Sequence, residues 1–107
     1  MALTRDFRET VLDAAQRDPA YRRGLLTRGF ALSHSADEED RAVGKSLLRD
    51  YINATIGFQA LAKELDKKPQ SLMRMLSPTG NPRLSNFAEL VDFLYEYEGI
   101  PLVETGD

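Results

Sequence analysis

The sequence contains no cysteine and a single histidine, His34. Without cysteine the chain has no disulfide framework, no thiolate ligand for zinc and no cysteine nucleophile. One histidine is too few for a multi-histidine metal site within one chain. These two scarcities exclude several common classes of enzyme and metal-binding domain.

Long apolar runs are also missing, because no stretch approaches the roughly 18 consecutive residues that a membrane-spanning helix needs. Residues 1–16 are charged and periodic, so they do not indicate a secretory signal peptide. The sequence offers no nucleophile–base pair and no carboxylate cluster of the kind that forms an active site. We therefore expect a cytoplasmic, non-enzymatic chain with no membrane association, no cofactor and no metal.

Signals for β-strands are nearly absent, whereas helical periodicity recurs along the whole chain. The pattern predicts an all-α protein with helices at about 4–17, from 19 to the polar break at 33–40, and then at about 38–55, 58–65, 69–76 and 85–97. Residues 1–36 are interpreted as a helical extension, residues 37–103 as the main domain of about four helices, and residues 104–107 as a frayed tail.

Capping residues mark several of these helix starts. Asp18 before Pro19 suits the N-cap and first position of a helix. Ser35 and Glu38 have the spacing of a capping box, and the acidic run at 37–40 is explained better by the positive end of a helix dipole than by a metal site. Ser85 is expected to cap the last helix.

Apolar spacing predicts which faces are buried. In the second helix Tyr21, Leu25, Leu26 and Leu32 are expected to point inward, and Arg22, Arg23 and Arg28 outward. The expected apolar face of the third helix comprises Val43, Leu47, Leu48, Tyr51, Ile52 and Ile56. The last helix is expected to bury Phe87, Leu90, Val91, Leu94 and Tyr95, with Ile100, Leu102 and Val103 packing back on the core.

The net charge of −3 is unevenly distributed. Residues 1–50 carry nine basic and nine acidic side chains, residues 59–83 carry five basic and two acidic, and residues 84–107 carry six acidic and no basic side chain. A polyanion responds to the local patch, so the basic segment in the middle is compatible with nucleic-acid binding despite the overall acidity.

The most informative segment is FQALAKELDKKPQSLMRML, residues 58–76. Two short amphipathic helices joined by a polar turn are typical of a helix-turn-helix, in which the second helix enters the DNA major groove. Ala62 supplies the small contact where the helices cross. The apolar residues that fix the crossing are Leu61, Leu65, Leu72, Met75 and Leu76.

Polar residues at the start of the second motif helix are the candidates for reading bases, since glutamine can pair with adenine and arginine or lysine with guanine. These candidates are Lys68, Gln70, Ser71 and Arg74. Gln70 and Arg74 are one helical turn apart and share a face. The residues expected to contact phosphate around this helix are Gln59, Lys63, Lys67, Asn81 and Arg83.

Residues from about 47 to 102 resemble the Xre, or λ-repressor-like, helix-turn-helix family, and especially its branch of addiction-module antidote (antitoxin) proteins. The matching pieces are LAKELDKKPQSLMRMLSP, then GNP, then an amphipathic helix with a short apolar tail. The resemblance implies an all-helical, non-catalytic DNA-binding domain that acts as a homodimer on an inverted repeat of double-stranded DNA. It further implies an autorepressor of a toxin–antitoxin operon, with a toxin protein as partner.

The chain departs from that family at the turn, where Asp66, Lys67 and Lys68 replace the usual glycine, apolar residue and serine. These departures and the acidic last helix leave an alternative, a helical protein-interaction domain that keeps the helix-turn-helix fold without binding DNA. The extension at 1–36 also has two interpretations. It either enlarges the core or binds a second copy of the chain, and we favour the dimerisation element because one helix-turn-helix contacts only one half-site.

Overall fold

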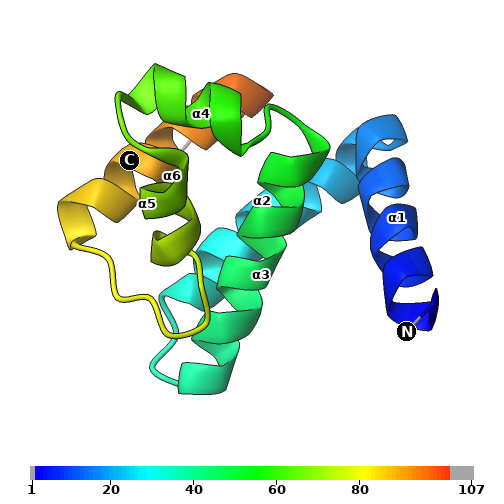
Figure 1. The fold of residues 1–107 in the computed structure, drawn as a ribbon, viewed down its shortest axis with the longest axis horizontal. Coiled ribbons are helices and arrows are strands. Elements are labelled where there is room, and N and C mark those ends of the chain that lie inside the picture. The colour runs from blue at the N-terminus through cyan, green and yellow to red at the C-terminus, as the bar shows by residue number, and fades with distance from the viewer. Residues whose placement is uncertain (1, 102–107) are drawn as a thin grey trace.

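The computed structural model describes the backbone of residues 2–101 and the side chains of residues 10–101. Six helices and no strand occupy this part of the chain, which confirms the predicted all-helical class. The helices are α1 (Ala2–Arg17), α2 (Pro19–Ser33), α3 (Glu38–Ala54), α4 (Phe58–Leu65), α5 (Pro69–Met75) and α6 (Leu84–Glu98). Figure 1 shows α1 on one side of α2 and α3, and α4, α5 and α6 on the other. None of the helices in residues 2–101 has a stretch long and apolar enough to cross a membrane.

Two glycines let α2 and α3 pack closely side by side. A Cβ atom added at Gly44 would lie 2.5 Å from the backbone nitrogen of Ser33 and 2.7 Å from the carbonyl oxygen of Gly29. A Cβ atom at Gly29 would lie 2.9 Å from the Cγ atom of Leu48. Larger side chains at either position would push the helices apart, so this pair of glycines sets the spacing at the centre of the fold.

A single hydrophobic core connects all six helices. Leu26, Leu48, Tyr51, Leu72 and Leu90 have no exposed surface, although they come from four different helices. The expected buried residues of α6 are all buried, as are Leu48, Tyr51 and Ile52 of α3. The other core members are Ala15, Leu25, Ala54, Phe58, Leu61, Ala62, Leu65, Leu76, Phe87, Val91, Leu94 and Tyr95.

The inward face of α2 differs from the expected one at two residues, Tyr21 and Arg22. Leu25 and Leu26 are buried as predicted, but Tyr21 is 39 % exposed and Arg22 is partly buried. The buried stripe passes through Arg22, Leu26 and Gly29, which follow helical spacing, and Tyr21 lies beside that stripe. The prediction placed the aromatic residue inward and the arginine outward, and both assignments were wrong.

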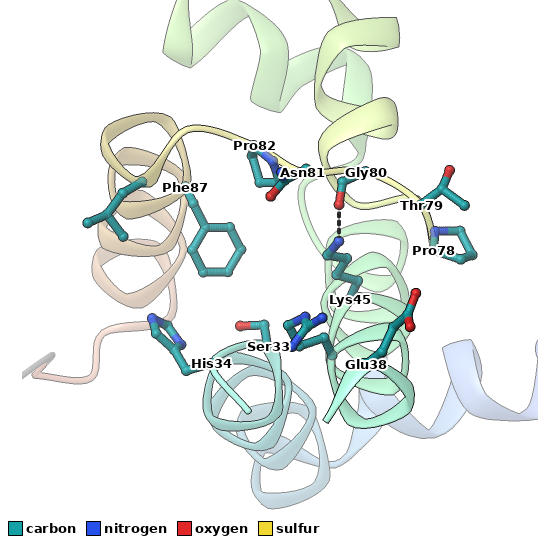
Figure 2. Close-up of a pocket in the computed structure, with 12 residues that line it drawn as sticks. Ser33, His34, Glu38, Lys45, Pro78, Thr79, Gly80, Asn81, Pro82 and Phe87 are labelled. Atoms are coloured by element: carbon teal, nitrogen blue, oxygen red, sulfur yellow. Dashed lines mark hydrogen bonds between the residues drawn. The ribbon is translucent and has the colours of Figure 1, made fainter. Parts of the chain in front are cut away.

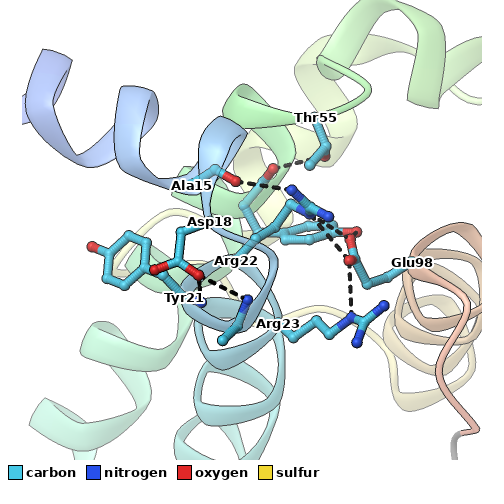
Figure 3. A network of polar contacts seen from close by, with 9 residues as sticks. Ala15, Asp18, Tyr21, Arg22, Arg23, Thr55 and Glu98 are labelled. Carbon is cyan, nitrogen blue, oxygen red and sulfur yellow. Dashed lines mark hydrogen bonds and ion pairs between the residues drawn. The ribbon is translucent and has the colours of Figure 1, made fainter.

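Arg22 points inward because it pairs with a buried carboxylate of α6. Its Nε atom lies 3.0 Å from both carboxylate oxygens of Glu98, whose side chain is only 5 % exposed, and its Nη1 atom donates to the carbonyl oxygen of Ala15 at 3.1 Å. The hydroxyl of Tyr51 donates to Glu98 at 2.7 Å, and Nε of Arg23 donates to it at 3.3 Å. Figure 3 shows Arg22 and Arg23 of α2 meeting the carboxylate of Glu98, and Arg22 also reaching Ala15 of α1.

The pKa of Glu98 reflects a competition between burial and these donors. Burial alone would raise the pKa, but the hydrogen bonds from Arg22 and Tyr51 and the arginine charges outweigh it, so that the pKa lies below its ordinary value. The same hydrogen bond to Glu98 raises the pKa of Arg22. Glu98 is therefore charged in the folded protein at neutral pH.

Helix starts agree with the sequence at Asp18 and differ at two other caps. The Asp18 side chain accepts from the backbone of Ala20 at 3.0 Å, as expected of an N-cap. The α3 cap is Asp37 instead of Ser35, whose hydroxyl accepts from the Asp37 backbone and donates to Asp40. The helix α6 begins one residue before Ser85, and no side chain caps it. Asp37, directly before α3, occupies the N-cap position that the expected capping box assigned to Ser35.

The remaining packing predictions are partly met. Val43 is 50 % exposed, so its predicted place on the buried face of α3 was wrong. Ile100 is partly buried against the core, as expected. Leu102, Val103 and the tail at 104–107 lie outside the described residues.

Candidate nucleic-acid interface

The helices α4 and α5 are joined by a turn of three residues, 66–68. Asp66 adopts a left-handed conformation with φ 55° and ψ 50°, which aspartate tolerates better than most residues. The backbone nitrogen of Lys67 donates to the carbonyl oxygen of Ala62 at 2.9 Å and closes the end of α4. Pro69 then occupies the first position of α5, where its missing N–H costs no hydrogen bond. Asp66 thus makes the turn that the resemblance assigns to glycine.

The small and apolar residues predicted to fix the crossing of these helices are buried. Ala62 is 2 % exposed, and Leu61, Leu72 and Leu76 have no exposed surface. Met75 is partly buried against the core. The buried sides of α4 and α5 therefore hold α5 against the rest of the protein, and its other side faces solvent.

Three of the four candidate base-reading residues are brought together with two candidate phosphate contacts. Lys68, directly before α5, and Ser71 and Arg74 of α5 line a shallow concavity of about 560 Å³ with Lys67 and Asn81. Lys68, Arg74 and Asn81 are exposed, whereas Ser71 and Lys67 are partly exposed. The remaining lining residues are Met75, Pro82 and Asn86, so no acidic side chain lines this surface. We name it the α5 concavity.

A second concavity of about 560 Å³ lies beside the first and contains the other phosphate candidates of α4. It is lined by Gln59, Lys63, Lys67 and Asp66, together with Ala60, Ala62 and Pro69. Lys67 lines both concavities and connects them. Its ammonium is also 3.5 Å from a carboxylate oxygen of Glu89 on α6.

Gln70 and Arg83 are exposed but line neither concavity. Gln70 is on α5, one turn before Arg74. Arg83 is the last residue before α6 and follows the loop at 77–82. Seven of the nine candidates therefore line one or the other concavity, and their contact with DNA stays a prediction.

Cationic residues of α3 hold the loop that follows α5, and sequence reasoning missed them. Arg49 donates to the carbonyl oxygen of Leu76, and Lys45 donates to that of Gly80. Within the loop the backbone nitrogen of Gly80 donates to Ser77 at 3.0 Å. A Cβ atom at Gly80 would collide with the carbonyl oxygen of Arg74, so the loop can lie against α5 only with glycine here.

A signal for these anchors is present in the sequence. Arg41, Lys45 and Arg49 recur every four residues and therefore share one face of α3. Burial and the neighbouring charges of Arg41 and Arg49 lower the pKa of Lys45. Asn86 of α6 is a further member of the α5 concavity that the sequence analysis did not include.

The described side chains thus form a basic, hydrogen-bonding surface on α5, supported by a buried crossing and an anchored loop. This surface can accept an anionic partner and offer it both cationic and amide donors. The chain has no significant match among protein-family models, curated proteins or solved structures.

Proposed function

We propose that this chain is a sequence-specific DNA-binding transcriptional regulator whose helix α5 enters the major groove. The observation that carries the proposal is the α5 concavity, which gathers Lys67, Lys68 and Arg74 with Ser71 and Asn81 and contains no acidic residue. DNA is recognised by this combination, because cations neutralise phosphate while amides and guanidinium groups pair with base edges. A λ-repressor-like helix-turn-helix is the fold we propose for α3–α6.

In this proposal Gln70 and Arg74 read neighbouring base pairs, since both are exposed on α5 and one turn apart. Lys68 and Ser71, nearer the start of α5, contact base edges or the flanking phosphate. These four residues form the readout surface.

Phosphate contacts come from both sides of that surface. The N-terminus of α4 has no side-chain cap, so its first N–H groups remain available to a phosphate beside Gln59. Lys63 adds charge on the same helix, and Asn81 and Arg83 lie on the opposite side of α5. Lys67 also contacts phosphate in this proposal, after its ion pair with Glu89 breaks.

We further propose that the protein acts as a homodimer on an inverted repeat and represses its own operon as the antitoxin of a cytoplasmic toxin. The support is the family resemblance of residues 47–102 and the geometric need for two half-sites about 34 Å apart. The extension at 1–36, which contains α1 and most of α2, is the candidate dimerisation element. Analytical ultracentrifugation with and without operator DNA tests this part, and a 12.0 kDa species under both conditions at micromolar concentration would rule out the dimer.

Fluorescence anisotropy with a duplex from the chain's own promoter tests DNA binding. The affinity should fall with rising salt, with a slope in log K of about −0.9 for each phosphate neutralised. Gln70→Ala and Arg74→Ala should each weaken binding to the cognate site by about 1–3 kcal/mol and reduce the preference over a scrambled duplex.

Arg28→Ala is the matched control, because Arg28 is an exposed arginine of α2 that lines neither concavity. It removes the same charge as Arg74→Ala and should leave the cognate affinity nearly unchanged. Equal binding by wild type, Gln70→Ala and Arg74→Ala would refute the assignment of α5 as the reader.

A protein-interaction domain is the second candidate, favoured by two observations. Asp66 is exposed at the turn directly before α5, and Lys67 is paired with Glu89. Both place negative charge near a DNA backbone that would approach this side. If the promoter duplex shows no salt-dependent binding while the protein captures its operon partner, this second function replaces the first.

A further inference from the structure

A cavity of about 470 Å³ lies between the α2–α3 corner and the loop at 77–82. This volume is within the range of roughly 300–1,000 Å³ that is usual for small-molecule sites. Figure 2 shows the loop with Asn81 and Pro82 along one side, Ser33 and His34 on the opposite side, and Phe87 and Lys45 on the two remaining sides. The cavity is separate from the α5 concavity, although Asn81 and Pro82 border both.

The polar wall of the cavity contains an incompletely paired buried cation. Lys45 is 7 % exposed and donates to the carbonyl oxygen of Gly80. An ammonium has three donors, and within residues 10–101 no other acceptor is recorded for Lys45. A buried ammonium that retains unused donors favours a further acceptor, and a negatively charged one most of all.

The charges around Lys45 strengthen this preference. Arg41 lines the same cavity, and Arg49 lies one turn further along α3. Arg41 donates to the carbonyl oxygens of Ser35 and Ala36 at 2.9 and 3.0 Å, so its charge has no carboxylate partner there. Glu38 is the one acidic residue that lines the cavity, and it is exposed. An anion between Lys45 and Arg41 would relieve the repulsion between the two cations.

The opposite wall is apolar and aromatic. Phe87 is 7 % exposed, and its ring centroid lies 5.7 Å from that of His34 at an interplanar angle of 64°. Leu84 is 76 % exposed at the rim, and Pro82 completes the surface. A flat apolar group would bury itself against these residues and cover the exposed leucine.

We propose that this cavity binds a small organic anion, with its acidic group between Lys45 and Arg41 and a planar apolar part against Phe87, Leu84 and Pro82. A carboxylate and a phosphate monoester share the chemistry that this site recognises. The proposal does not depend on DNA binding, so the two can fail separately. If both hold, a ligand here contacts the loop that follows α5 and that Lys45 ties to α3, and it is positioned to alter the reader helix.

Titration of the isotopically labelled full chain, followed by ¹H–¹⁵N correlation spectra, tests the proposal. The probes are benzoate and phenyl phosphate, with benzyl alcohol as a neutral aromatic control and inorganic phosphate as an anion without an apolar part. Both aromatic anions should shift the amides of Ser33, Lys45, Gly80 and Asn81 in a saturable manner, with a Kd on the order of 1 mM for ligands of this size. The two control probes should bind at least about tenfold more weakly.

Three variants connect the binding to the proposed residues. Lys45→Met should weaken both aromatic anions by about tenfold or more, because it removes the charged donor. Glu38→Gln removes the repelling carboxylate from an exposed position and should tighten them about two- to threefold. Arg28→Gln removes an arginine outside the cavity and should change nothing.

The proposal can still be tested if one of these variants does not fold. If Lys45→Met does not fold, an unchanged or weaker affinity of Glu38→Gln overturns the proposal. Equal binding of benzyl alcohol and benzoate, or shifts scattered over the surface cations instead of the cavity amides, overturns it as well.

Discussion

Replacing Gly44 with alanine should destabilise the protein, although alanine is the better helix former. The new Cβ atom would lie 2.5 Å from the Ser33 nitrogen and 2.7 Å from the Gly29 oxygen, both of which are backbone atoms. Cβ contacts below 3.0 Å are essentially never seen, so α2 and α3 must separate by about half an ångström along their contact. Overpacking of this kind costs about 1–3 kcal/mol, and the gain in helix propensity returns about 1 kcal/mol. We expect a net loss of up to about 2 kcal/mol.

Gly24 provides a control in the same helix pair. A Cβ atom at Gly24 meets nothing within 4 Å, so Gly24→Ala should stabilise the protein by about 0.5–1 kcal/mol through backbone entropy alone. Urea unfolding followed by far-UV circular dichroism measures both free energies, and the two variants should shift the midpoint in opposite directions. If Gly44→Ala is as stable as Gly24→Ala, the close approach of α2 and α3 is wrong.

Two further substitutions test the buried carboxylate and the turn. Glu98→Gln should cost about 1–3 kcal/mol at neutral pH, because it leaves the Arg22 charge without its partner. The pKa of Glu98 is lowered in the folded state, so its contribution is complete above the ordinary value of 4.5 and is lost as the pH falls through the lower folded pKa. Urea unfolding from pH 7 downward measures the difference in stability between wild type and Glu98→Gln. This difference should narrow only below about pH 4.5, and a difference that stays constant with pH would contradict the account. Asp66→Gly should stabilise the fold by about 0.5–1 kcal/mol, because glycine adopts the left-handed backbone conformation without strain. It should also tighten promoter binding in the anisotropy assay, because it removes a negative charge beside α5. Weaker DNA binding with improved stability would argue for the protein-interaction function.

The helical elements could be predicted from the sequence because their signals are local. Asp18–Pro19 and Asp66 each lie at a helix boundary in the structure, and the bounds of α4 agree with the sequence to the residue. The apolar spacing of α6 identified every one of its buried residues. The spacing of candidate site residues was also informative, because Lys68, Ser71 and Arg74 follow each other at helical intervals on the exposed side of α5.

Features that depend on contacts between distant residues could not be predicted. Arg22 was assigned to the surface because nothing near it in the sequence reveals that Glu98, 76 residues later, is its buried partner. Nothing near Gly29 in the sequence reveals that its lack of a side chain permits the close contact with α3. The contacts of Lys45 and Arg49 could not be predicted for the same reason. Their acceptors are backbone carbonyl oxygens 35 and 27 residues later, and no sequence pattern marks them. Pairing across the fold overrides local amphipathic periodicity in each case.

The central claim is that α5 and its neighbouring loop form the surface that meets DNA. Chemical-shift mapping of a promoter half-site duplex onto the labelled chain in ¹H–¹⁵N spectra tests it most directly. We expect the largest changes at the amides of 67, 68, 70–74, 81 and 83, with smaller ones at the start of α4, and little change on α1 or on α6. Changes confined to α1 or α6, or no change at a concentration where anisotropy reports binding, would contradict the claim.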